Sequence, residues 1–273
     1  MIRACVMGSP VAHSLSPKLH GFWLRKYKIN GEYTLREVTP EQLKDTLDRL
    51  VAEGFAGGNL TIPLKEHALP LMDELDESCR VSGAVNTVVI RKGRKYGYNS
   101  DGFGFLESLK AQYPQWDGAR VVILGTGGAA RSIIAALKNA GAGHFVLVNR
   151  TRERAEKTAR GLELKGAGIF EWEDRAASLK NATLLVNCSS LGMAGRPALD
   201  LDLSALPKTA AVCDIVYRPL ITALLVEAKR RGNPVVEGLP MLLHQGRLGF
   251  RQWFGVDPEV TDELRREITR GIP

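Results

Sequence analysis

The sequence predicts an α/β protein of two domains, the first built on a mixed sheet and the second on a parallel sheet. The chain of 273 residues is long enough to bury two modest hydrophobic cores. Segments with the pattern of strands alternate with segments of helical periodicity along most of the chain, as in α/β folds. Beyond residue 118 the apolar runs become nearly continuous, which is typical of parallel strands covered on both faces.

In the first part of the chain, short apolar runs predict strands at residues 4–8, 33–38, 57–63, 84–90 and 95–99. Ser16 and Pro17 predict the start of a helix, with Ser16 as its N-cap and Pro17 in its first turn. A second helix is expected to begin at Pro40. The last two strands flank Lys92 and Gly93 and predict a hairpin, so antiparallel pairing enters this sheet.

The second part of the chain follows a βαβ pattern. Strands are predicted at residues 119–125, 144–149, 183–188, 210–216 and 234–238, with a helix at 127–141 after the first of them. Helices after Pro240 must bury their apolar faces, and we expect them to return to the first domain. The predicted divisions are a first domain at 1–101, a second at 102–237 and C-terminal helices at 238–273.

The chain carries a net charge of +7, and its isoelectric point is about 9.3. Its lysines and arginines are spread out, without a basic run interleaved with aromatic residues, so we expect no nucleic-acid partner. Anionic small molecules suit this charge better, although solubility alone would explain most of it equally well. No apolar run is long enough for a membrane span, and the N-terminus reaches a turn too early for a signal peptide, which predicts a cytoplasmic protein.

The cysteines and histidines show neither a disulfide framework nor a metal-binding pattern. Cys5, Cys79, Cys188 and Cys213 are scattered in or beside apolar stretches, and we expect buried, reduced thiols. None of the five histidines lies in a metal-binding motif. We therefore predict no structural or catalytic metal.

A glycine-rich motif marks the second domain. Gly125, Thr126, Gly127, Gly128, Ala129 and Ala130 form the pattern GxGxxA between a predicted strand and a predicted helix. Gly125 would permit the tight turn, Gly127 would let the backbone approach a pyrophosphate, and Ala130 would let the helix pack closely on the strand. The free N–H groups of the helix N-terminus would face the phosphates. The motif predicts a Rossmann-like dinucleotide-binding domain, and a purely structural turn is the weaker explanation.

The residues after the next strand indicate which dinucleotide binds. NAD-binding domains usually place Asp or Glu there to hold the ribose hydroxyls. This chain has Asn149, followed by Arg150, Thr151, Arg152 and Arg154. Guanidinium groups bind a 2′-phosphate through paired hydrogen bonds, so we expect NADP. A solvated helix start would also explain the arginines, but cations are disfavoured at a helix N-terminus.

Polar residues of the first domain gather at predicted strand ends and helix starts. Ser14 and Ser16 lie at the start of a helix, where their hydroxyls could hold a carboxylate. Thr61 and Lys65 follow a strand, at the sheet edge where ligands bind in open α/β folds. Asn86 adds an amide. Taken singly, each residue is explained as well by turn or cap chemistry, or by a solvated surface position.

Taken together and in this order, the motifs resemble the shikimate dehydrogenase family over essentially the whole chain. The segments that carry the resemblance are SLS (14–16), NLTIPLK (59–65), GAVNT (83–87), NSDG (99–102), the glycine loop (125–130), NRT (149–151), DIVYRP (214–219) and EGLPMLLHQ (237–245). The family has a substrate domain followed by a Rossmann domain, and its last helices return to the substrate domain. Its reaction is the reversible NADP-linked reduction of 3-dehydroshikimate to shikimate, a step of aromatic amino-acid (chorismate) biosynthesis.

The resemblance implies a role for each candidate residue. Lys65 and Asp101 would form the catalytic pair. The substrate would be bound by Ser14, Ser16, Thr61, Lys65, Asn86, Asp101, Tyr217 and Gln245. The cofactor would be bound by Glu77, Gly125, Thr126, Gly127, Gly128, Ala129, Ala130, Asn149, Arg150, Thr151, Arg154, Ile215 and Gly238. The small departures from the family pattern, such as Thr126 for the usual Ala and Ser100 for the usual Thr, bear more on cofactor affinity than on chemistry.

The expected chemistry follows from the ketone substrate. Hydride transfer to the ketone carbon leaves an alkoxide, which Lys65 can protonate as an ammonium, and Asp101 beside it would keep it charged. In the reverse direction Lys65 must accept a proton as a neutral amine, which loss of solvent would favour. We therefore expect Lys65 to be the general acid and base, and Asp101 to orient it and bind substrate.

Other functions remain open at this point. A quinate/shikimate dehydrogenase would accept more substrates and both NAD and NADP, although Asn149 and Arg150 argue against NAD. A methylenetetrahydrofolate dehydrogenase would have no use for the serine pair. A catalytically silent NADP-binding regulatory protein would not need Lys65 and Asp101. The sequence is compatible with a monomer or a homodimer.

Overall fold

The computed structural model describes residues 1–270, which form two compact units. Among these residues, the first unit comprises 1–101 and 243–270, and the second comprises 102–242. The end of the predicted C-terminal segment, residues 271–273, lies outside the described residues. Each unit is built on its own six-stranded sheet.

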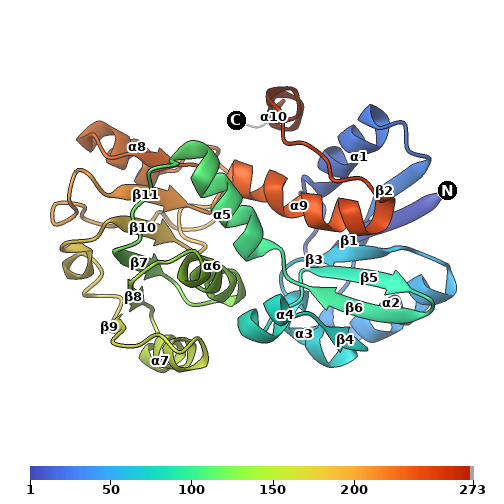
Figure 1. The fold of residues 1–273 in the computed structure, drawn as a ribbon, viewed down its shortest axis with the longest axis horizontal. Coiled ribbons are helices and arrows are strands. Elements are labelled where there is room, and N and C mark those ends of the chain that lie inside the picture. Colours follow the sequence, from blue (N-terminus) through green and yellow to red (C-terminus); the bar gives the residue numbers. More distant parts are fainter. Residues whose placement is uncertain (271–273) are drawn as a thin grey trace. The chain divides into compact units, whose positions relative to one another are not determined.

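The first unit contains a mixed sheet (Figure 1). Its strands lie in the order β2 (Gly31–Glu37), β1 (Ile2–Gly8), β3 (Gly57–Leu60), β5 (Thr87–Arg91), β6 (Arg94–Tyr98) and β4 (Glu74–Leu75). β1 is parallel to β2 and β3, whereas β5 is antiparallel to β3 and β6. The helices are α1 (Ser16–Lys26), α2 (Leu43–Ala52), α3 (Leu64–His67), α4 (Glu77–Ser82), most of α9 (Leu239–Phe254) and α10 (Asp262–Thr269).

Local chemistry sets the turns and helix starts of this unit. The hairpin between β5 and β6 turns at Lys92 and Gly93, whose φ angles of 49° and 77° lie in the left-handed region that tight hairpin turns use. The predicted helix does begin at Ser16, but Ser16 is not its N-cap, because Leu15 holds that position. The Ser14 hydroxyl instead accepts a hydrogen bond from the Ser16 N–H at 3.3 Å, since it reaches a helix donor that has no partner within the helix.

Two layers of side chains cover this sheet. On one face, Cys5 of β1 belongs to the same core as Leu43 and Leu47, which are four residues apart on α2. The opposite face carries an aromatic cluster contributed by α1, β2 and α9: His20, Trp23, Tyr33, Phe250, Trp253 and Phe254. α10 packs against α1. The C-terminal helices therefore return to the first sheet, as the sequence predicts.

The second unit contains a parallel sheet. Its strands lie in the order β12 (Val235–Val236), β11 (Ala211–Asp214), β10 (Leu184–Asn187), β7 (Arg120–Leu124), β8 (His144–Val148) and β9 (Gly168–Phe170). The helices are α5 (Asp101–Gln112), α6 (Gly128–Asn139), α7 (Arg152–Gly161) and α8 (Ala223–Arg231). The chain moves outward from β7 to β9 and then restarts at β10 on the other side of β7, which is the Rossmann order.

Successive residues of β7 enter two different cores. Ile123 belongs to the core that contains Ile133 of α6, and Leu124 belongs to the core that contains Leu225 of α8. Helices thus cover both faces of the sheet, which explains why its strands are continuously apolar in sequence. The predicted fold class is confirmed. In residues 1–270 the structure contains no helix that is long and apolar enough to cross a membrane.

The elements that sequence analysis missed are short. β4 has two residues and β9 has three, which is too few to show a period. The helix expected at Pro40 starts as a 3-10 turn, Pro40–Gln42, before α2 begins. The strand predicted at 210–216 ends at Asp214, because the next residues form a loop.

Candidate active site

An ion pair joins two residues of the first unit that are far apart in sequence. Lys65 Nζ donates to Asp101 Oδ2 at 2.7 Å. Lys65 lies in α3, just after β3, and its carbonyl accepts from the Val85 N–H at 2.8 Å. Asp101 is the first residue of α5 and is 3% exposed, whereas the Lys65 side chain is 23% exposed. The ammonium therefore lies at the accessible edge of a buried polar cluster.

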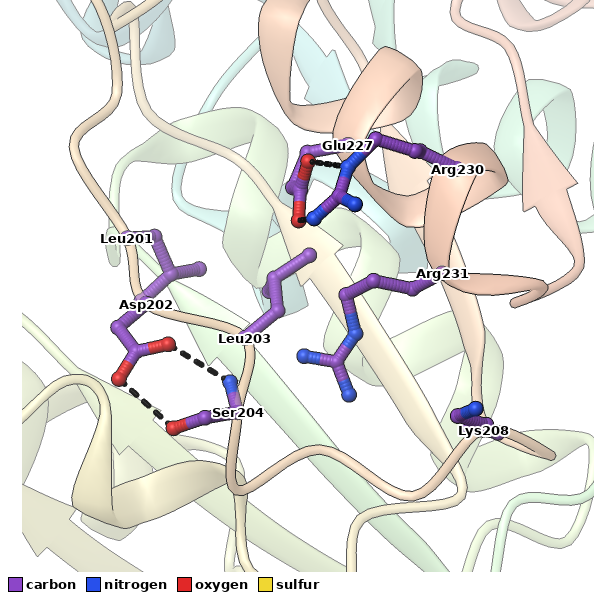
Figure 2. Close-up of a pocket in the computed structure, with 8 residues that line it drawn as sticks. All are labelled: Leu201, Asp202, Leu203, Ser204, Lys208, Glu227, Arg230 and Arg231. Carbon is purple, nitrogen blue, oxygen red and sulfur yellow. Dashed lines mark hydrogen bonds and ion pairs between the residues drawn. The ribbon is translucent and has the colours of Figure 1, made fainter.

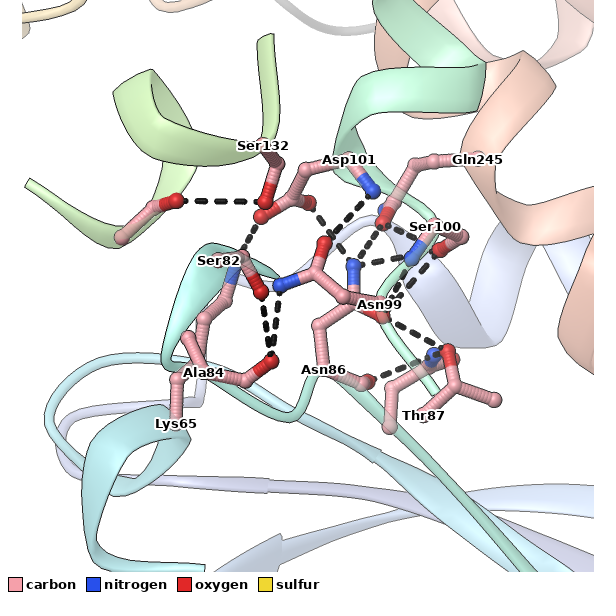
Figure 3. Close-up of polar contacts among 12 residues, drawn as sticks. Lys65, Ser82, Ala84, Asn86, Thr87, Asn99, Ser100, Asp101, Ser132 and Gln245 are labelled. Carbon is pink, nitrogen blue, oxygen red and sulfur yellow. Dashed lines mark hydrogen bonds and ion pairs between the residues drawn. The ribbon is translucent and has the colours of Figure 1, made fainter. Parts of the chain in front are cut away.

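Asn86 connects Asp101 to α9. Its Nδ2 donates to Asp101 Oδ1 at 2.8 Å and to Gln245 Oε1 at 3.2 Å (Figure 3). Its Oδ1 accepts from the Ser100 N–H at 2.9 Å. Because a backbone N–H can only donate, this bond determines which end of the amide faces Asp101. The structure thus brings together the predicted residues Lys65, Asn86, Asp101 and Gln245.

Asn99 forms the start of α5. Its Oδ1 accepts from the Asp101 N–H at 3.0 Å, and its Nδ2 donates to the Ala84 carbonyl at 2.9 Å. A side-chain oxygen in this position satisfies one of the donors that have no partner within the helix. The Asp101 carboxylate is therefore not needed as a cap and is available to Lys65 and Asn86.

The remaining predicted residues of the first unit lie around strand ends and helix starts. Ser14 is in the loop before α1, Ser16 is the first residue of α1, and Thr61 follows β3. A Cβ at Gly8, the last residue of β1, would clash with the Thr61 methyl group, so glycine makes room for Thr61. Glu77 is exposed at the start of α4.

The glycine loop of the second unit is open along its backbone. Gly125 follows β7 with a φ angle of 89°, as a tight turn requires. Gly127 is the N-cap of α6, and a Cβ built there would meet no atom within 4 Å. The Thr126 hydroxyl is buried and lacks a hydrogen-bond partner among residues 1–270. An open backbone, a buried hydroxyl and a helix N-terminus fit a pyrophosphate group.

Exposed guanidinium groups follow β8. Asn149 Nδ2 donates to the Thr151 carbonyl at 2.9 Å, which shapes the turn into α7. Arg152 pairs with Glu156 at 3.0 Å. Within the described part of the chain, Arg150 and Arg154 form no ion pair, and both are exposed. The charge of these two guanidinium groups suits a 2′-phosphate.

A buried carboxylate organises the loop after β11. Asp214 Oδ1 accepts from Asn187 Nδ2 and from the Val216 N–H, each at 3.0 Å, and Oδ2 accepts from Thr222 Oγ1 at 2.7 Å. Burial raises the pKa of Asp214 to about 6, against the opposing effect of these donors, the largest of which comes from Thr222. The carboxylate thus joins the ends of two adjacent strands to the start of α8, whose N-cap is Thr222.

The same loop carries two predicted site residues. Tyr217 is largely covered, and burial raises the pKa of its phenol. Ile215 follows Asp214 directly. A Cβ at Gly238 would lie 2.5 Å from the Val216 carbonyl oxygen and 2.7 Å from that of Asp214, so only glycine allows this approach. The structure therefore places Ile215 and Gly238 side by side.

A groove in the second unit lies near the amino ends of the strands of its sheet. It is lined by Leu201, Asp202, Leu203, Ser204, Lys208, Glu227, Arg230 and Arg231 (Figure 2). The lining residues precede β11 or end α8, so they lie at the amino ends of the strands. Arg230 is held there by two hydrogen bonds of 2.7 Å to Glu227. Doubly wound sheets bind ligands at the carboxyl ends, so this groove is not the cofactor site.

The two units divide the predicted residues between them. The first unit holds the predicted catalytic pair and most predicted substrate ligands, with Glu77 apart on α4. The second holds the other predicted cofactor residues and Tyr217. Asn59 and Thr87, two buried polar residues of adjacent strands, lie within motifs that carry the family resemblance but were given no role from the sequence. Polar side chains within otherwise apolar strands were the available signal.

Among residues 1–270, no three His, Cys, Asp or Glu side chains are grouped as a metal site would need.

A Rossmann sheet with an open glycine loop, together with a separate unit that holds a lysine–carboxylate pair, defines a dinucleotide-dependent oxidoreductase. Residues 6–88 match the model of the shikimate dehydrogenase substrate-binding domain, and residues 107–192 match that of shikimate/quinate 5-dehydrogenases. Residues 238–263 match the shikimate 5′-dehydrogenase C-terminal domain. The chain belongs to the shikimate dehydrogenase family.

Relatives and solved structures agree with this assignment. The NADP(+) shikimate dehydrogenase of Paramagnetospirillum magneticum is 49% identical over 266 residues, which cover 96% of each chain. The crystal structure of the Thermus thermophilus shikimate 5-dehydrogenase with NADP(H) and shikimate is 39% identical, with a TM-score of 0.88 over 99% of each chain. The quinate dehydrogenase of Corynebacterium glutamicum with NAD is 28% identical, with a TM-score of 0.91 over 98% of this chain and 99% of that one.

Proposed function

We propose that the protein is an NADP-dependent shikimate dehydrogenase, which reversibly reduces 3-dehydroshikimate to shikimate in the biosynthesis of aromatic amino acids. The observation that carries the proposal is the buried cluster in which Lys65 pairs with Asp101, while Asn86 links Asp101 to Gln245. It offers one accessible ammonium, one carboxylate and two amides. A small polyhydroxylated ring with one reactive ketone needs this set of donors and acceptors.

The first unit is proposed as the substrate-binding domain. Ser14 and Ser16 would donate hydroxyl protons to the substrate carboxylate at the start of α1. Thr61, Asn86 and Gln245 would hold the ring hydroxyls. Tyr217, from the loop after β11, is proposed as a further ligand. Each of these groups is neutral, so the positive charge of Lys65 stays directed at the reacting oxygen.

Lys65 is proposed as the general acid and base. In reduction its ammonium donates a proton to the oxygen of the former ketone, and in oxidation its neutral amine takes the proton of the hydroxyl. Asp101 holds Nζ at 2.7 Å and is itself held by Asn86 at 2.8 Å, so the amine is aimed before the substrate binds. We propose Asp101 as the residue that orients Lys65 and as a ligand of the substrate.

The second unit is proposed as the NADP-binding domain. When bound, NADP supplies or accepts the hydride. The loop Gly125–Ala130 would hold the pyrophosphate, and residues 149–154 the ribose 2′-phosphate. Ile215 and Gly238 would lie beside the nicotinamide, and Glu77 is a further proposed contact.

Four free cysteines are compatible with a reducing compartment, and we propose the cytoplasm. A monomer and a homodimer both fit this proposal.

A second candidate is a quinate/shikimate dehydrogenase that accepts both cofactors. The likeness to the NAD-bound quinate dehydrogenase supports it. Arg150 and Arg154 oppose it, because two exposed guanidinium groups suit a phosphate that NAD lacks.

The test of the proposed function is the identity of the product. The protein is supplied with 3-dehydroshikimate and NADPH that carries deuterium at the transferable position of the nicotinamide. We expect shikimate with deuterium at the former ketone carbon, detected by NMR and mass spectrometry. Oxidation of NADPH without label in shikimate would reject the proposal.

A further inference from the structure

Thr87 lies directly behind the proposed substrate amide of Asn86. It is the first residue of β5, and it is the register partner of Asn59 on β3. Thr87 is fully buried and Asn59 is 7% exposed. Two polar side chains that face each other inside a sheet must satisfy each other or their neighbours, because water cannot reach them.

The chemistry of the groups determines the direction of each hydrogen bond in this pair. The Asn86 carbonyl can only accept, so Asn59 Nδ2, 3.1 Å away, must donate to it. The same Nδ2 lies 3.1 Å from Thr87 Oγ1 and donates to it as well. The Thr87 hydroxyl is thus an acceptor toward Asn59, and its own proton is directed to Asn86 Oδ1 at 2.9 Å.

The other end of Asn59 is held from a third strand. Asn59 Oδ1 accepts from the Tyr33 hydroxyl of β2 at 2.6 Å. The Tyr33 ring is stacked on His20, with ring centroids 4.0 Å apart, and is 8% exposed. A directed chain of hydrogen bonds therefore runs from Tyr33 through Asn59 and Thr87 to Asn86.

This chain meets the substrate cluster at the Asn86 amide. Its Oδ1 is held from one side by Thr87 Oγ1 and from the other by the Ser100 N–H, each at 2.9 Å. Nδ2 is thereby directed to Asp101 and Gln245. Ser100 also reaches Oδ1 through its Oγ, at 3.2 Å. Without the Thr87 hydroxyl, the amide oxygen would be held by Ser100 alone and would lose its only contact from β5, so its orientation would be less tightly fixed.

We propose that Thr87 is a positioning residue for substrate binding, because its hydroxyl fixes the Asn86 amide in the plane in which Nδ2 meets the substrate hydroxyls. The inference rests on the proposed function, since that function makes Asn86 a substrate ligand. Asn59 donates to the Thr87 hydroxyl and Tyr33 donates to Asn59, so both residues support the Asn86 amide indirectly. Valine has the shape of threonine without the hydroxyl, and serine keeps the hydroxyl without the methyl group.

The test compares T87V, T87S and wild type in steady-state oxidation of shikimate by NADP. We expect T87V to raise the KM for shikimate about tenfold, the effect of one lost hydrogen bond, while the KM for NADP stays within about twofold. T87S should restore the shikimate KM to within about threefold of wild type. T46V is the matched control: Thr46 is another buried threonine of the first unit, on α2, and its variant should match wild type in both constants.

A shikimate KM of T87V within twofold of wild type would overturn the inference, and so would an equal rise in both KM values or a T87S variant as impaired as T87V. If T87V does not fold, T87A takes its place, because it also removes the hydroxyl, and T87S controls for the lost methyl group. T87A should raise the shikimate KM about tenfold, and an unchanged value would overturn the inference. A wild-type protein without shikimate turnover would refute the proposed function itself.

Discussion

The position of Lys65 distinguishes it from the other lysines and makes it the proposed catalytic residue. Most lysines are solvated surface groups, and nothing in the composition of residues 59–65 separates this one from the others. The structure places its ammonium 2.7 Å from a carboxylate that is 3% exposed, and it leaves the lysine side chain 23% exposed. A mobile surface lysine has neither feature.

Replacement of Lys65 by methionine removes the proton donor and keeps the length of the side chain. Because general acid–base catalysis contributes about 10²- to 10⁴-fold, we expect kcat of K65M to fall by about that factor and the KM for shikimate to rise less than about fivefold. Steady-state kinetics measure both constants. K44M, at an exposed lysine of α2, is the control and should match wild type. An unchanged kcat in K65M would remove Lys65 from the chemistry.

Asp214 links pH to stability. Its pKa is about 6 in the folded protein against 3.8 for the ordinary group, mainly because of burial. The folded state therefore binds this proton more tightly than the unfolded state, so the contribution to stability is present below about pH 4 and is lost as the pH rises to about 6. At neutral pH the buried, charged carboxylate lowers the stability of the fold, and its three hydrogen bonds offset part of this loss.

Replacement of Asp214 by asparagine removes the titration. We expect the difference in unfolding free energy between wild type and D214N to shift by about 2 kcal/mol between about pH 4.5 and about pH 7, in favour of D214N at the higher pH. Urea unfolding of both proteins at both pH values measures it. The other carboxyl groups titrate in both proteins, so their contributions cancel in the difference between the two unfolding free energies. A difference that does not vary with pH would show that the pKa of Asp214 is not raised.

The glycine loop before α6 allows a substitution that should weaken cofactor binding without changing the stability of the fold. A Cβ at Gly127 meets nothing in the protein, and the φ angle of −76° suits any residue. The methyl group of G127A would enter only the space proposed for the pyrophosphate. We expect the KM for NADP to rise at least about tenfold, with Tm within about 2 °C of wild type. G161A, at an equally open glycine of α7, should leave the KM for NADP unchanged. Equal KM values in wild type and G127A would contradict the proposed pyrophosphate site.

The start of α7 tests the choice of cofactor. Arg150 is exposed, and its proposed partner is the 2′-phosphate that distinguishes NADP from NAD. Loss of charge-assisted hydrogen bonds in R150A should raise the KM for NADP about tenfold to a hundredfold and leave the KM for NAD unchanged. R160A, at the far end of the same helix, is the control. A parallel loss with both cofactors would show that Arg150 does not contact the 2′-phosphate.

The elements also show what can be predicted from sequence. Periodicity and turn chemistry locate the long helices and strands, because those signals are local: the turn at Lys92 and Gly93 and the apolar run of β7 are examples. β4 and β9 are too short to carry a period. Motifs name Asn86 as a candidate, but its contacts with Asp101 and Gln245 depend on register and long-range packing. The support of Asn86 by Thr87 and Asn59 depends on strand pairing in the same way.

At the scale of the whole molecule, each unit has its own sheet and its own core, so each can keep its site rigid independently. The first unit holds the lysine–carboxylate pair and the second holds the glycine loop. In the proposed function, the first unit would carry out the proton transfer and the second would bind the cofactor. Family membership over nearly the full chain supports the assignment of both parts.

Oxidation of shikimate with NADP is tested by initial rates of cofactor reduction, measured at 340 nm with the wild-type protein. Shikimate and quinate are each paired with NADP and with NAD. We expect kcat/KM for shikimate with NADP to exceed that of either substrate with NAD by at least about a hundredfold, because Arg150 and Arg154 are proposed to bind the 2′-phosphate that NAD lacks, and we expect a lower kcat/KM for quinate with NADP. Comparable rates with quinate or NAD would contradict the assigned specificity, and no turnover with any pair would contradict the assigned chemistry.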